Sequence, residues 1–537
     1  MKKFICVLLA CLLGGLSTFS IAACTHNEIL PIEFDDDGEP YTIKYYMPVG
    51  DINGVDDIDR IVEAVNEELV TKLPNTTLDI IPFGMQEYSS RMAPIIGTYQ
   101  PFDICFTSPS FNNYLTNVQQ ESFFPLDYVL PKYAPKTYAK FDQRLWNQTK
   151  VNGHIYGVIN NQILPRTASF HVGNIDYFNE YMEETYPDQN ANVDTAYLFV
   201  ENDIINQDNP YTGFDLVEDY MNWLTEKNIG SGVGGEGITG FIGFSRQMQT
   251  FFMMDDLGTG MQVPGVVRLN GNTAEVVNQF ETEEFDYLID RAISWRTSGI
   301  IPADSSNRGN QDDKLDISVT ATWKPGDVRN SARGDGIRSA PIRLGNPYYY
   351  TSYVLGTMNA ISATSENPAR AMKFLELLGN DPVIHNLLQF GEEEVDYYIP
   401  DPEKPEQIEL ITGSGYTNSS FGWGLGDEFL SFRTTNQDYD LWEQVALINN
   451  TAEISPVIGF MFDSTPVATE LLQCMGIYNR YFNESAGTGF PGATYADTKA
   501  EVEKFRSEMK AAGGDKIVAE KQRQLNEWLA AQNTQEG

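Results

Sequence analysis

The most regular pattern of apolar and polar positions lies between residues 358 and 398. Asn367 is followed by Pro368, which combines a helix-capping side chain with a proline at the first helical position. Apolar residues then recur with helical spacing, at Ala371, Phe374, Leu375 and Leu378. A second start signal and a second stripe follow, at Asp381, Pro382, Ile384, Leu387 and Leu388. We therefore predict two consecutive helices that pack on a core, the first ended by a left-handed glycine, Gly379, and the second closed by Gly391.

The first part of the folded chain alternates between strand and helix patterns. Runs rich in β-branched and aromatic residues predict strands at 42–47, 77–83 and 102–107. Helical patterns fall between these runs, at 55–73 and 86–96. This alternation predicts right-handed crossovers and a mainly parallel sheet. Ligands of such open sheets bind beyond the carboxyl ends of the strands, which here are 48–54, 83–88 and 107–114.

Residues 166–314 have a less regular pattern. A strand is expected to end near His171, and helices are expected at 175–186, 215–227 and 282–298. We also expect a strand at 317–323, where the chain returns to the first lobe, that is, to the unit formed by the first part of the chain. The run GVGGEG at 232–237 matches the spacing of a dinucleotide-binding loop. A strand pattern follows it where that site requires a helix, so we reject this interpretation.

The amino-terminal region has the composition of a secretory signal. A basic start and a short apolar run precede small residues and Cys24. A cysteine after Ala-Ala resembles a bacterial lipobox, which predicts that Cys24 carries a lipid; the alternative is an ordinary signal peptide. Residues 24–40 are polar and acidic, as in a tether. Beyond the signal, no run reaches the ~20 apolar residues of a membrane-spanning helix.

The net charge narrows the range of possible functions, and the length and the cysteines bear on the architecture. The formal net charge of −39 repels phosphate backbones and anionic membrane surfaces, which argues against nucleic-acid binding. A length of 537 residues predicts two or more lobes. Cys105 and Cys474 are the cysteines left after the signal and Cys24. The sequence leaves open whether these two cysteines form a disulfide, and it favours two buried thiols.

No motif of a catalytic centre is found in the sequence. There is no Gly-x-Ser-x-Gly elbow, no His-Glu-x-x-His and no P-loop, and no cysteine pair has the spacing of a zinc site. The histidines of the folded body, His154, His171 and His385, are scattered, which favours structural or surface roles. We therefore expect neither a catalytic residue nor a cofactor, and the sequence leaves a bound metal ion open.

Several stretches resemble a known family. They are the predicted helix pair, the Pro-Leu-Asp turn and Gly-x-x-Tyr-Gly strand within 123–160, the run NNTAEISPVIGFMFDSTPVATELL at 449–472, and the tail from Phe505. Their amino-acid sequences resemble those of the extracellular solute-binding proteins of bacterial ABC importers, of the family 1 type. It is most similar to the lipoprotein branch with a carboxyl-terminal domain of unknown function. The resemblance implies an α/β, type II periplasmic-binding-protein-like fold of two lobes, each a mainly parallel sheet flanked by helices.

This resemblance suggests a division of the chain into discontinuous lobes. The expected parts are a signal peptide at 1–23, a lipidated tether at 24–40, lobe I at 41–160 plus 315–360, and lobe II at 161–314 plus 361–537. The last part includes a family-specific region at 395–537. The candidate first hinge is 160–165, and crossings between the lobes are expected near 160–166, 310–317 and 356–364.

The resemblance implies a carbohydrate ligand, and the residue types at the expected cleft suit one. Aromatic faces match the C–H surface of a sugar ring, and amides, carboxylates and Arg hydrogen-bond its hydroxyls. The candidate ligand-binding residues are Phe106, Ser108, Ser110, Arg166, Trp323, Tyr349, Trp423 and Asp463. We expect the glycines beside Trp423 to leave its indole uncovered. The alternative for each residue is core packing or a turn, and Asp463 could cap a helix before Pro466.

The resulting hypothesis is a monomeric receptor that is not an enzyme. It captures an oligosaccharide by closing two lobes around it and passes it to the permease subunits of an ABC transporter. It is anchored to the outer face of the cell membrane only through its lipid. Two alternatives stay open, a secreted glycan hydrolase and a surface glycan-binding or adhesion lipoprotein without a transporter. A peptide receptor is a weaker variant of the favoured class.

Overall fold

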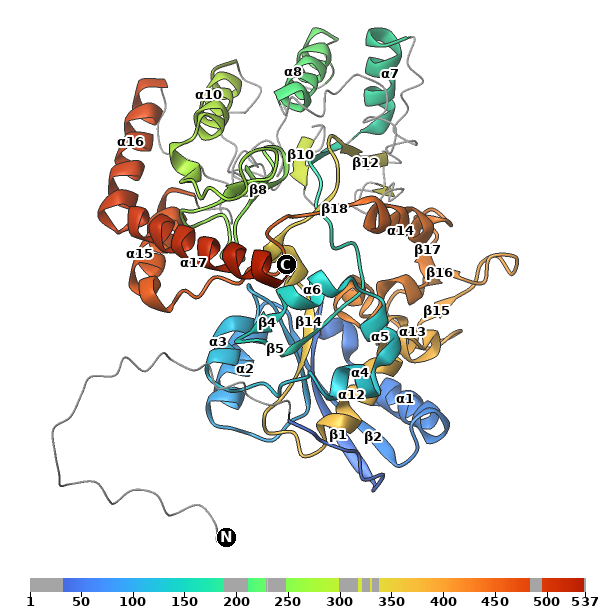
Figure 1. Ribbon diagram of the computed structural model, residues 1–537. Helices are drawn as coiled ribbons and strands as arrows, with labels where there is room; N and C mark the ends of the chain where they lie inside the picture. The colour runs from blue at the N-terminus through green and yellow to red at the C-terminus, as the bar shows by residue number, and fades with distance from the viewer. Residues whose placement is uncertain are drawn as a thin grey trace, which may run out of the picture.

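The computed structural model describes residues 32–172, 174–187, 211–227, 229, 248–298, 317–320, 329–330, 338–482 and 495–535. Within these ranges the chain forms two lobes, one above the other in Figure 1, around two main hydrophobic cores. The expected two-lobed α/β architecture is confirmed. The signal region, Cys24, Trp323 and the GVGGEG run lie outside the described residues. Among the helices that are described, none is long and apolar enough to cross a membrane.

The sheet of lobe I has five strands in the order β2-β1-β3-β14-β6. They are β1 (Tyr41–Val49), β2 (Thr76–Gly84), β3 (Ile104–Thr107), β6 (Gly157–Ile159) and β14 (Met358–Ile361). β1 pairs in parallel with β2 and β3, whereas β14 runs antiparallel to β3 and β6. The three strands predicted in the first part of the chain are therefore β1, β2 and β3, and the mainly parallel sheet is confirmed for this lobe.

Helices and short elements surround this sheet. The helices are α1 (Ile58–Lys72), α2 (Tyr88–Gly97), α3 (Tyr114–Gln119), α4 (Val129–Tyr133), α5 (Pro135–Ala139), α6 (Gln143–Gln148), α12 (Pro368–Leu378) and α13 (Pro382–Phe390). A turn of 3-10 helix, η1 (Ile52–Val55), and a hairpin of β4 (Lys150–Val151) and β5 (His154–Ile155) complete the set. The predicted stripe of α1 is buried at Ile61, Val65 and Leu69, so the amphipathic pattern identifies its core face.

The predicted helix pair is present as α12 and α13. Asn367 caps α12, since its Oδ1 accepts the Arg370 N–H at 2.9 Å, and Asp381 caps α13 in the same way. Gly379 has a φ of −90°, so the left-handed residue predicted at the end of α12 is wrong, whereas Gly391 ends α13 with a φ of +84°. Both helices lie in the core of lobe I, where α12 packs against α4 and α13 against α1. Their assignment to lobe II is therefore also wrong.

Lobe II contains a four-stranded sheet in the order β10-β7-β12-β11. Its strands are β7 (Ser169–Val172), β10 (Ile317–Thr320), β11 (Arg329–Asn330) and β12 (Arg338–Arg343), and a hairpin of β8 (Met254–Asp255) and β9 (Val267–Arg268) lies nearby. The helices are α7 (Ile175–Thr185), α8 (Tyr211–Glu226), α10 (Glu283–Ser298), α15 (Ala468–Tyr481), α16 (Tyr495–Ala511) and α17 (Gly514–Gln535), with 3-10 turns η4 (Gln279–Glu281) and η7 (Thr465–Val467). The helices predicted at 175–186, 215–227 and 282–298 are α7, α8 and α10.

Two expectations for lobe II are wrong. Its sheet is not mainly parallel among the described strands, because β7 runs antiparallel to both β10 and β12, and β11 antiparallel to β12. The strand predicted at 317–323 does not return to lobe I, because β10 pairs with β7. An apolar pattern specifies that a segment is a strand, but neither its direction nor the sheet that it joins.

Over the residues that the structure describes, the chain passes between the two cores three times. Leu164 and Ala168 flank the first crossing, and Leu344 and Tyr349 flank the second. The third lies near residues 457–460, whose apolar side chains divide between the two cores. The expected first crossing is confirmed. The expected crossings near 310–317 and 356–364 are wrong, because β10 and β12 both belong to lobe II and β14 belongs to lobe I.

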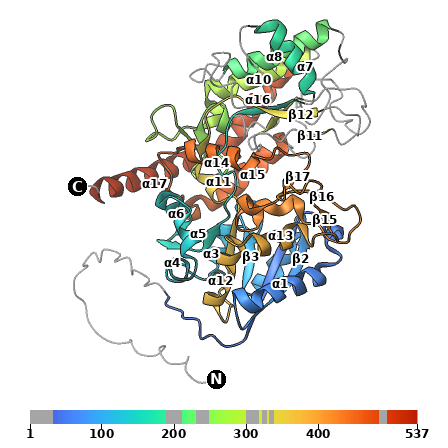
Figure 2. The same ribbon diagram turned by 90° about the vertical axis from the view of Figure 1, so that its right-hand side faces the viewer.

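Smaller elements lie around these crossings. They are β13 (Tyr348–Tyr349) paired with β18 (Glu453–Ile454), the sheet of β15 (Tyr397–Tyr398), β16 (Gln407–Leu410) and β17 (Arg433–Thr434), the helices α11 (Thr351–Val354) and α14 (Leu441–Thr451), and the 3-10 turns η5 (Ser419–Gly424) and η6 (Glu428–Leu430). The carboxyl-terminal helix α17 runs at the level between the lobes in both views (Figures 1 and 2).

The two cysteines of the described body are both free thiols. Cys105 lies in the core of lobe I and Cys474 in that of lobe II, and both are buried. The expectation of two buried thiols is confirmed.

Candidate functional site

The carboxyl end of β1 in lobe I meets η5, which comes from much later in the chain. The Gly50 N–H donates to Oδ1 of Asn418 at 3.2 Å, and the Thr417 N–H donates to the carbonyl of Gly54 at 2.6 Å. A Cβ at Gly50 would lie 1.8 Å from Oγ of Ser420, so η5 approaches the backbone too closely for a side chain there. η5 therefore lies at the sheet edge where ligands of open α/β sheets bind.

Trp423 of η5 lies in an aromatic cluster with Phe106 of β3 and Phe421. Its ring centroid is 5.7 Å from that of Phe106 and 4.6 Å from that of Phe421, with edge-to-face geometry in both pairs. The indole Nε1–H donates to the carbonyl of Ser420 at 3.0 Å. Phe106 and Phe421 are buried, whereas Trp423 is partly exposed. These contacts fix the indole while leaving part of it accessible to a ligand.

The glycines beside Trp423 are also required by close packing. A Cβ at Gly422 would lie 2.2 Å from Nε2 of Gln389, and a Cβ at Gly424 would lie 2.2 Å from Cζ of Phe421. Both glycines thus make room for neighbouring side chains.

Arg166 lies in the first crossing and joins it to the second. Its N–H donates to the carbonyl of Tyr348 at 2.8 Å, and the Tyr348 N–H donates to the carbonyl of Arg166 at 2.9 Å. The guanidinium carbon lies 4.0 Å from the ring centroid of Tyr353, a cation–π distance. Arg166 and Tyr353 are both partly exposed. They place a planar cation and an aromatic ring, two groups that suit a sugar, at the junction of the lobes.

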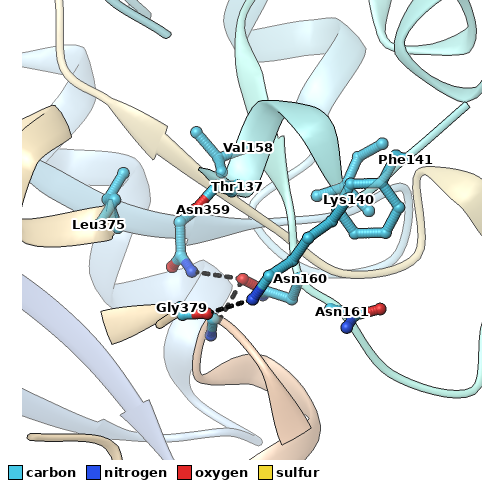
Figure 3. A pocket seen from close by; sticks show the side chains of 11 residues that line it. Thr137, Lys140, Phe141, Val158, Asn160, Asn161, Asn359, Leu375 and Gly379 are labelled. Atoms are coloured by element: carbon cyan, nitrogen blue, oxygen red, sulfur yellow. Dashed lines mark hydrogen bonds between the residues drawn. The ribbon is translucent and has the colours of Figure 1, made fainter. Parts of the chain in front are cut away.

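A buried amide network connects the first crossing to β14 (Figure 3). Nδ2 of Asn359 donates to Oδ1 of Asn160 at 2.8 Å, and Nδ2 of Asn160 donates to the carbonyl of Gly424 at 3.0 Å. Both asparagines are 1% exposed. The cavity beside them measures about 10 Å³, which is at most enough for one water molecule. This pocket is too small for a sugar, so we assign the network a structural role at the hinge.

A larger hollow of about 590 Å³ opens on lobe II beside β9 and the start of α10. Its lining residues are Arg268, Val277, Asn278, Glu281, Thr282, Glu283 and Glu284. All of these residues belong to lobe II, so this hollow is not the space between the lobes.

Two buried carboxylates lie where lobe II meets α11. Asp255 accepts hydrogen bonds from the N–H of Thr351, at 3.0 Å, and from its hydroxyl. Burial raises the pKa of the Asp255 carboxyl, and burial together with the charge of Asp255 raises that of Asp256. These bonds cap α11 and fix the second crossing to lobe II.

Lys521 of α17 reaches the same place from the carboxyl-terminal region. Its Nζ donates to the carbonyl of Gly265 at 2.6 Å and to Oγ1 of Thr259 at 2.7 Å. Lys521 has no exposed surface, and burial lowers the pKa of its ammonium group although the two nearby carboxylates oppose this. Helix α17 is thereby connected through lobe II to the second crossing.

The remaining candidate residues do not join the aromatic cluster. Ser108 is buried in a turn, where its Oγ accepts the Ser110 N–H at 3.2 Å, and Ser110 is exposed. The hydroxyl of Tyr349 donates to the carbonyl of Asn449 at 3.1 Å. Asp463 is exposed, and its Oδ1 accepts the N–H of Thr465 at 3.0 Å just before the 3-10 turn η7, whose N-cap is Ser464. Trp323 lies outside the described residues.

Sequence reasoning missed Tyr353, Phe421 and the Asp255–Lys521 region. Tyr353 belongs to a tyrosine-rich run and Phe421 to the same run as Trp423, so only proximity to a predicted residue could have suggested them. Lys521 lies in a helical segment rich in charged residues, a composition that predicts a solvent-exposed side chain. Nor did the sequence indicate a metal site, and across the described ranges no cluster of three or more His, Cys, Asp or Glu is placed to hold a metal ion.

Comparison with known proteins places these features in a family context. The family model described as Domain of unknown function (DUF3502) matches residues 456–530, which span the third crossing and α15 to α17. A curated protein described as a carbohydrate ABC transporter substrate-binding protein, from Streptococcus pneumoniae serotype 4 (strain ATCC BAA-334 / TIGR4), is 23% identical over 523 residues. The match covers 95% of each chain.

Solved structures share the fold over most of the chain. The N-glycan transport solute binding protein (NgtS) of Streptococcus pneumoniae has a TM-score of 0.69 at 21% identity, covering 91% of this chain and 99% of that one. A complex of the same protein with Man5GlcNAc has a TM-score of 0.61 at 20% identity and the same coverage. The FusA EF-hand mutant of S. pneumoniae, in complex with fructo-nystose, has a TM-score of 0.52 at 11% identity, covering 91% of this chain and 100% of that one. These comparisons confirm the periplasmic-binding-protein-like fold and the resemblance to ABC-transporter solute-binding proteins.

Proposed function

This chain has the fold of the solute-binding proteins of ABC transporters and carries the DUF3502 domain, and from this premise we propose that it captures an oligosaccharide for an ABC importer. The observation that carries the proposal is the fixed, partly exposed Trp423 at the carboxyl edge of the lobe I sheet. A rigid aromatic ring at this edge binds the C–H face of a sugar without losing much side-chain entropy. The neighbouring structures support the ligand class, since NgtS is described in complex with Man5GlcNAc and the FusA EF-hand mutant in complex with fructo-nystose.

The mechanism that we propose is closure of the two lobes around the ligand. Three crossings connect the lobes, and their short length suits a hinge that absorbs the rotation. A ligand that contacts both lobes stabilises the closed state by its higher affinity for that state. Arg166 and Tyr353, at the junction, and Trp423, on lobe I, are the contacts we assign. No covalent bond of the ligand changes in this cycle.

Partners and location follow from the same proposal. We assign the permease subunits of an ABC transporter as the partner that receives the sugar. We also assign a lipid on Cys24 as the anchor to the outer face of the cell membrane. An intact-mass measurement of the mature protein checks the anchor, because lipidation adds the mass of the acyl chains at Cys24, and Cys24→Ser removes that added mass.

Trp423→Ala is expected to weaken glycan binding at least about tenfold, which corresponds to ~1.4 kcal/mol. Titration calorimetry with mannose-containing N-glycan fragments, fructo-oligosaccharides and milk oligosaccharides measures the change. The control is Trp223→Ala, which removes a tryptophan of α8 that is partly buried in lobe II. Equal loss in both variants, or no loss at Trp423, would contradict the assigned site.

The same titrations separate binding from hydrolysis. A receptor gives stoichiometric binding and releases no new reducing ends, whereas a glycan hydrolase gives turnover. Stimulation of the ATPase activity of the reconstituted transporter by the glycan-loaded protein distinguishes a transport receptor from an adhesion lipoprotein. Binding without such stimulation by any co-encoded permease would favour the adhesion alternative.

A further inference from the structure

Residues 32–40, expected to belong to the tether, lie against lobe I instead. Phe34 packs edge-to-face on Phe124, with ring centroids 6.4 Å apart. Asp35 accepts a hydrogen bond from the hydroxyl of Tyr133 at 2.8 Å and pairs with Lys132. Lys132 and Tyr133 belong to α4. We call residues 32–40 the strap, because they are attached along the surface of the lobe by side-chain contacts.

The central contact of the strap is an ion cluster around Asp36. Arg370 of α12 donates to both of its oxygens, from Nε at 2.8 Å and from Nη2 at 2.7 Å, and Lys373 donates at 2.6 Å. The side chains of Asp36 and Arg370 are 4% and 2% exposed. Burial opposes ionisation of Asp36, but the hydrogen bonds from Arg370 and Lys373 outweigh it, so the pKa of this carboxyl is lowered. A bidentate pair of this kind is among the stronger ionic contacts of proteins.

Arg370 also connects the strap to the amino end of β2. Its Nη1 donates to the carbonyl of Asn75 at 2.9 Å and to Oγ1 of Thr76 at 2.8 Å. Nδ2 of Asn75 donates in turn to the carbonyl of Gly38 at 3.0 Å. The strap thus ends at the amino ends of the parallel strands of lobe I. The aromatic cluster of Trp423 lies near the opposite, carboxyl ends of these strands.

We infer that the strap makes lobe I the anchored lobe, so that lobe II is the lobe that swings when the protein is bound to the membrane. This inference depends on the lipid at Cys24, which belongs to the proposed function. The linker from Cys24 to Ile32 spans at most about 29 Å. That is about half the diameter of a folded body of this length. The strap end of lobe I is therefore held within this distance of the membrane surface, whereas lobe II is connected to the anchor only through lobe I.

The first experiment is hydrogen exchange of the strap in the full, purified chain. Asp36→Asn should accelerate amide exchange in residues 32–40 at least about tenfold, because it leaves Arg370 buried without its anionic partner. The matched control is Asp37→Asn, which removes the same charge from an exposed neighbour whose Oδ1 accepts the nearby Glu39 N–H at 3.1 Å, and it should leave the exchange unchanged. Both variants should keep their glycan affinity.

Equal exchange in the two variants, or exchange in the wild type as fast as in an unstructured peptide, would overturn the strap. Because glycan affinity is measured separately, failure of the receptor hypothesis would appear as lost binding with an intact strap.

The second experiment measures the orientation of the lipidated protein on vesicles. Donor dyes are placed on Lys136→Cys of α5, in lobe I, or on Glu183→Cys of α7, in lobe II; both positions are exposed. Labelling is selective because Cys105 and Cys474 are buried. Energy transfer to acceptor lipids should be stronger from lobe I than from lobe II, and Asp36→Asn should reduce the difference. Equal transfer from both lobes in the wild type, or no association with the vesicles, would overturn lobe I as the anchored lobe.

Discussion

Gly426→Ala is expected to lower the free energy of unfolding by about 3 kcal/mol. Gly426 has a φ of +67°, a conformation that costs an alanine about 1 kcal/mol. A Cβ there would also lie 2.8 Å from the backbone carbon and oxygen of Leu378 and 2.9 Å from the nitrogen of Gly379. These are backbone atoms at the end of α12, which cannot rotate away, and overpacking of this kind costs about 1–3 kcal/mol. Urea unfolding monitored by circular dichroism measures the change.

The substitution should also disturb the hinge. The carbonyl of Gly426 accepts the N–H of Asn161 at 2.7 Å, and its own N–H donates to Oδ1 of Asn160 at 3.2 Å. The control is Gly413→Ala, since Gly413 has a φ of +78° but no atom within 4 Å of the added Cβ. It should cost only the conformational part, about 1 kcal/mol. Equal losses at the two glycines would show that close packing against α12 contributes nothing.

Stability is expected to fall by up to about 3 kcal/mol between pH 7 and pH 4 because of His385. Burial lowers the pKa of this imidazole from 6.5 to about 4, and the Asp427 charge only partly opposes the shift. A lowered pKa means that the folded state binds fewer protons than the unfolded state. The stability is therefore complete above pH 6.5 and is lost as the pH falls towards 4, at ~1.36 kcal/mol per pKa unit.

The surroundings of His385 explain why it stays neutral. The ring has no exposed surface, and its Nε2 lies 3.0 Å from both Oε1 of Gln389 and Oγ of Ser431. Urea unfolding at several pH values between 4 and 8 should give a steep slope in the wild type and a shallower one in His385→Gln. An unchanged slope in the variant would assign the acid sensitivity to other groups.

The fold of lobe I follows from the sequence more fully than that of lobe II. In lobe I the strands β1 and β2 are each followed by an amphipathic helix, α1 and α2, so the element types and the parallel direction of β1, β2 and β3 are fixed by short-range connections. The caps of α12 and α13 are equally local, since Asn367 and Asp381 act on N–H groups two or three residues away. In lobe II the strands β7, β10 and β12 pair across long separations, and no local pattern specifies such partners.

The candidate site is predictable only in part for the same reason. Trp423 and Phe106 are both selected by residue type and place along a strand or loop. Their contact with each other depends on η5 approaching Gly50, a tertiary arrangement that the sequence does not encode locally. For Asp255 and Lys521 the residue type was misleading. Charged residues are predicted to be solvent-exposed, but the structure shows that both of these are buried. The attachment of the strap to lobe I could not be predicted, because its polar, acidic composition is that of a flexible linker.

The position of β14 in the sheet has a consequence for how the chain acquires its structure. This strand lies between β3 and β6, and β6 joins the sheet only through it. Lobe I thus cannot complete its sheet until residues 358–361 are available, by which time much of lobe II has also been synthesised. Closing such long loops is entropically costly and slows folding. The chain therefore passes through a stage with an unfinished sheet edge exposed, at which chaperones bind it and proteases cut it.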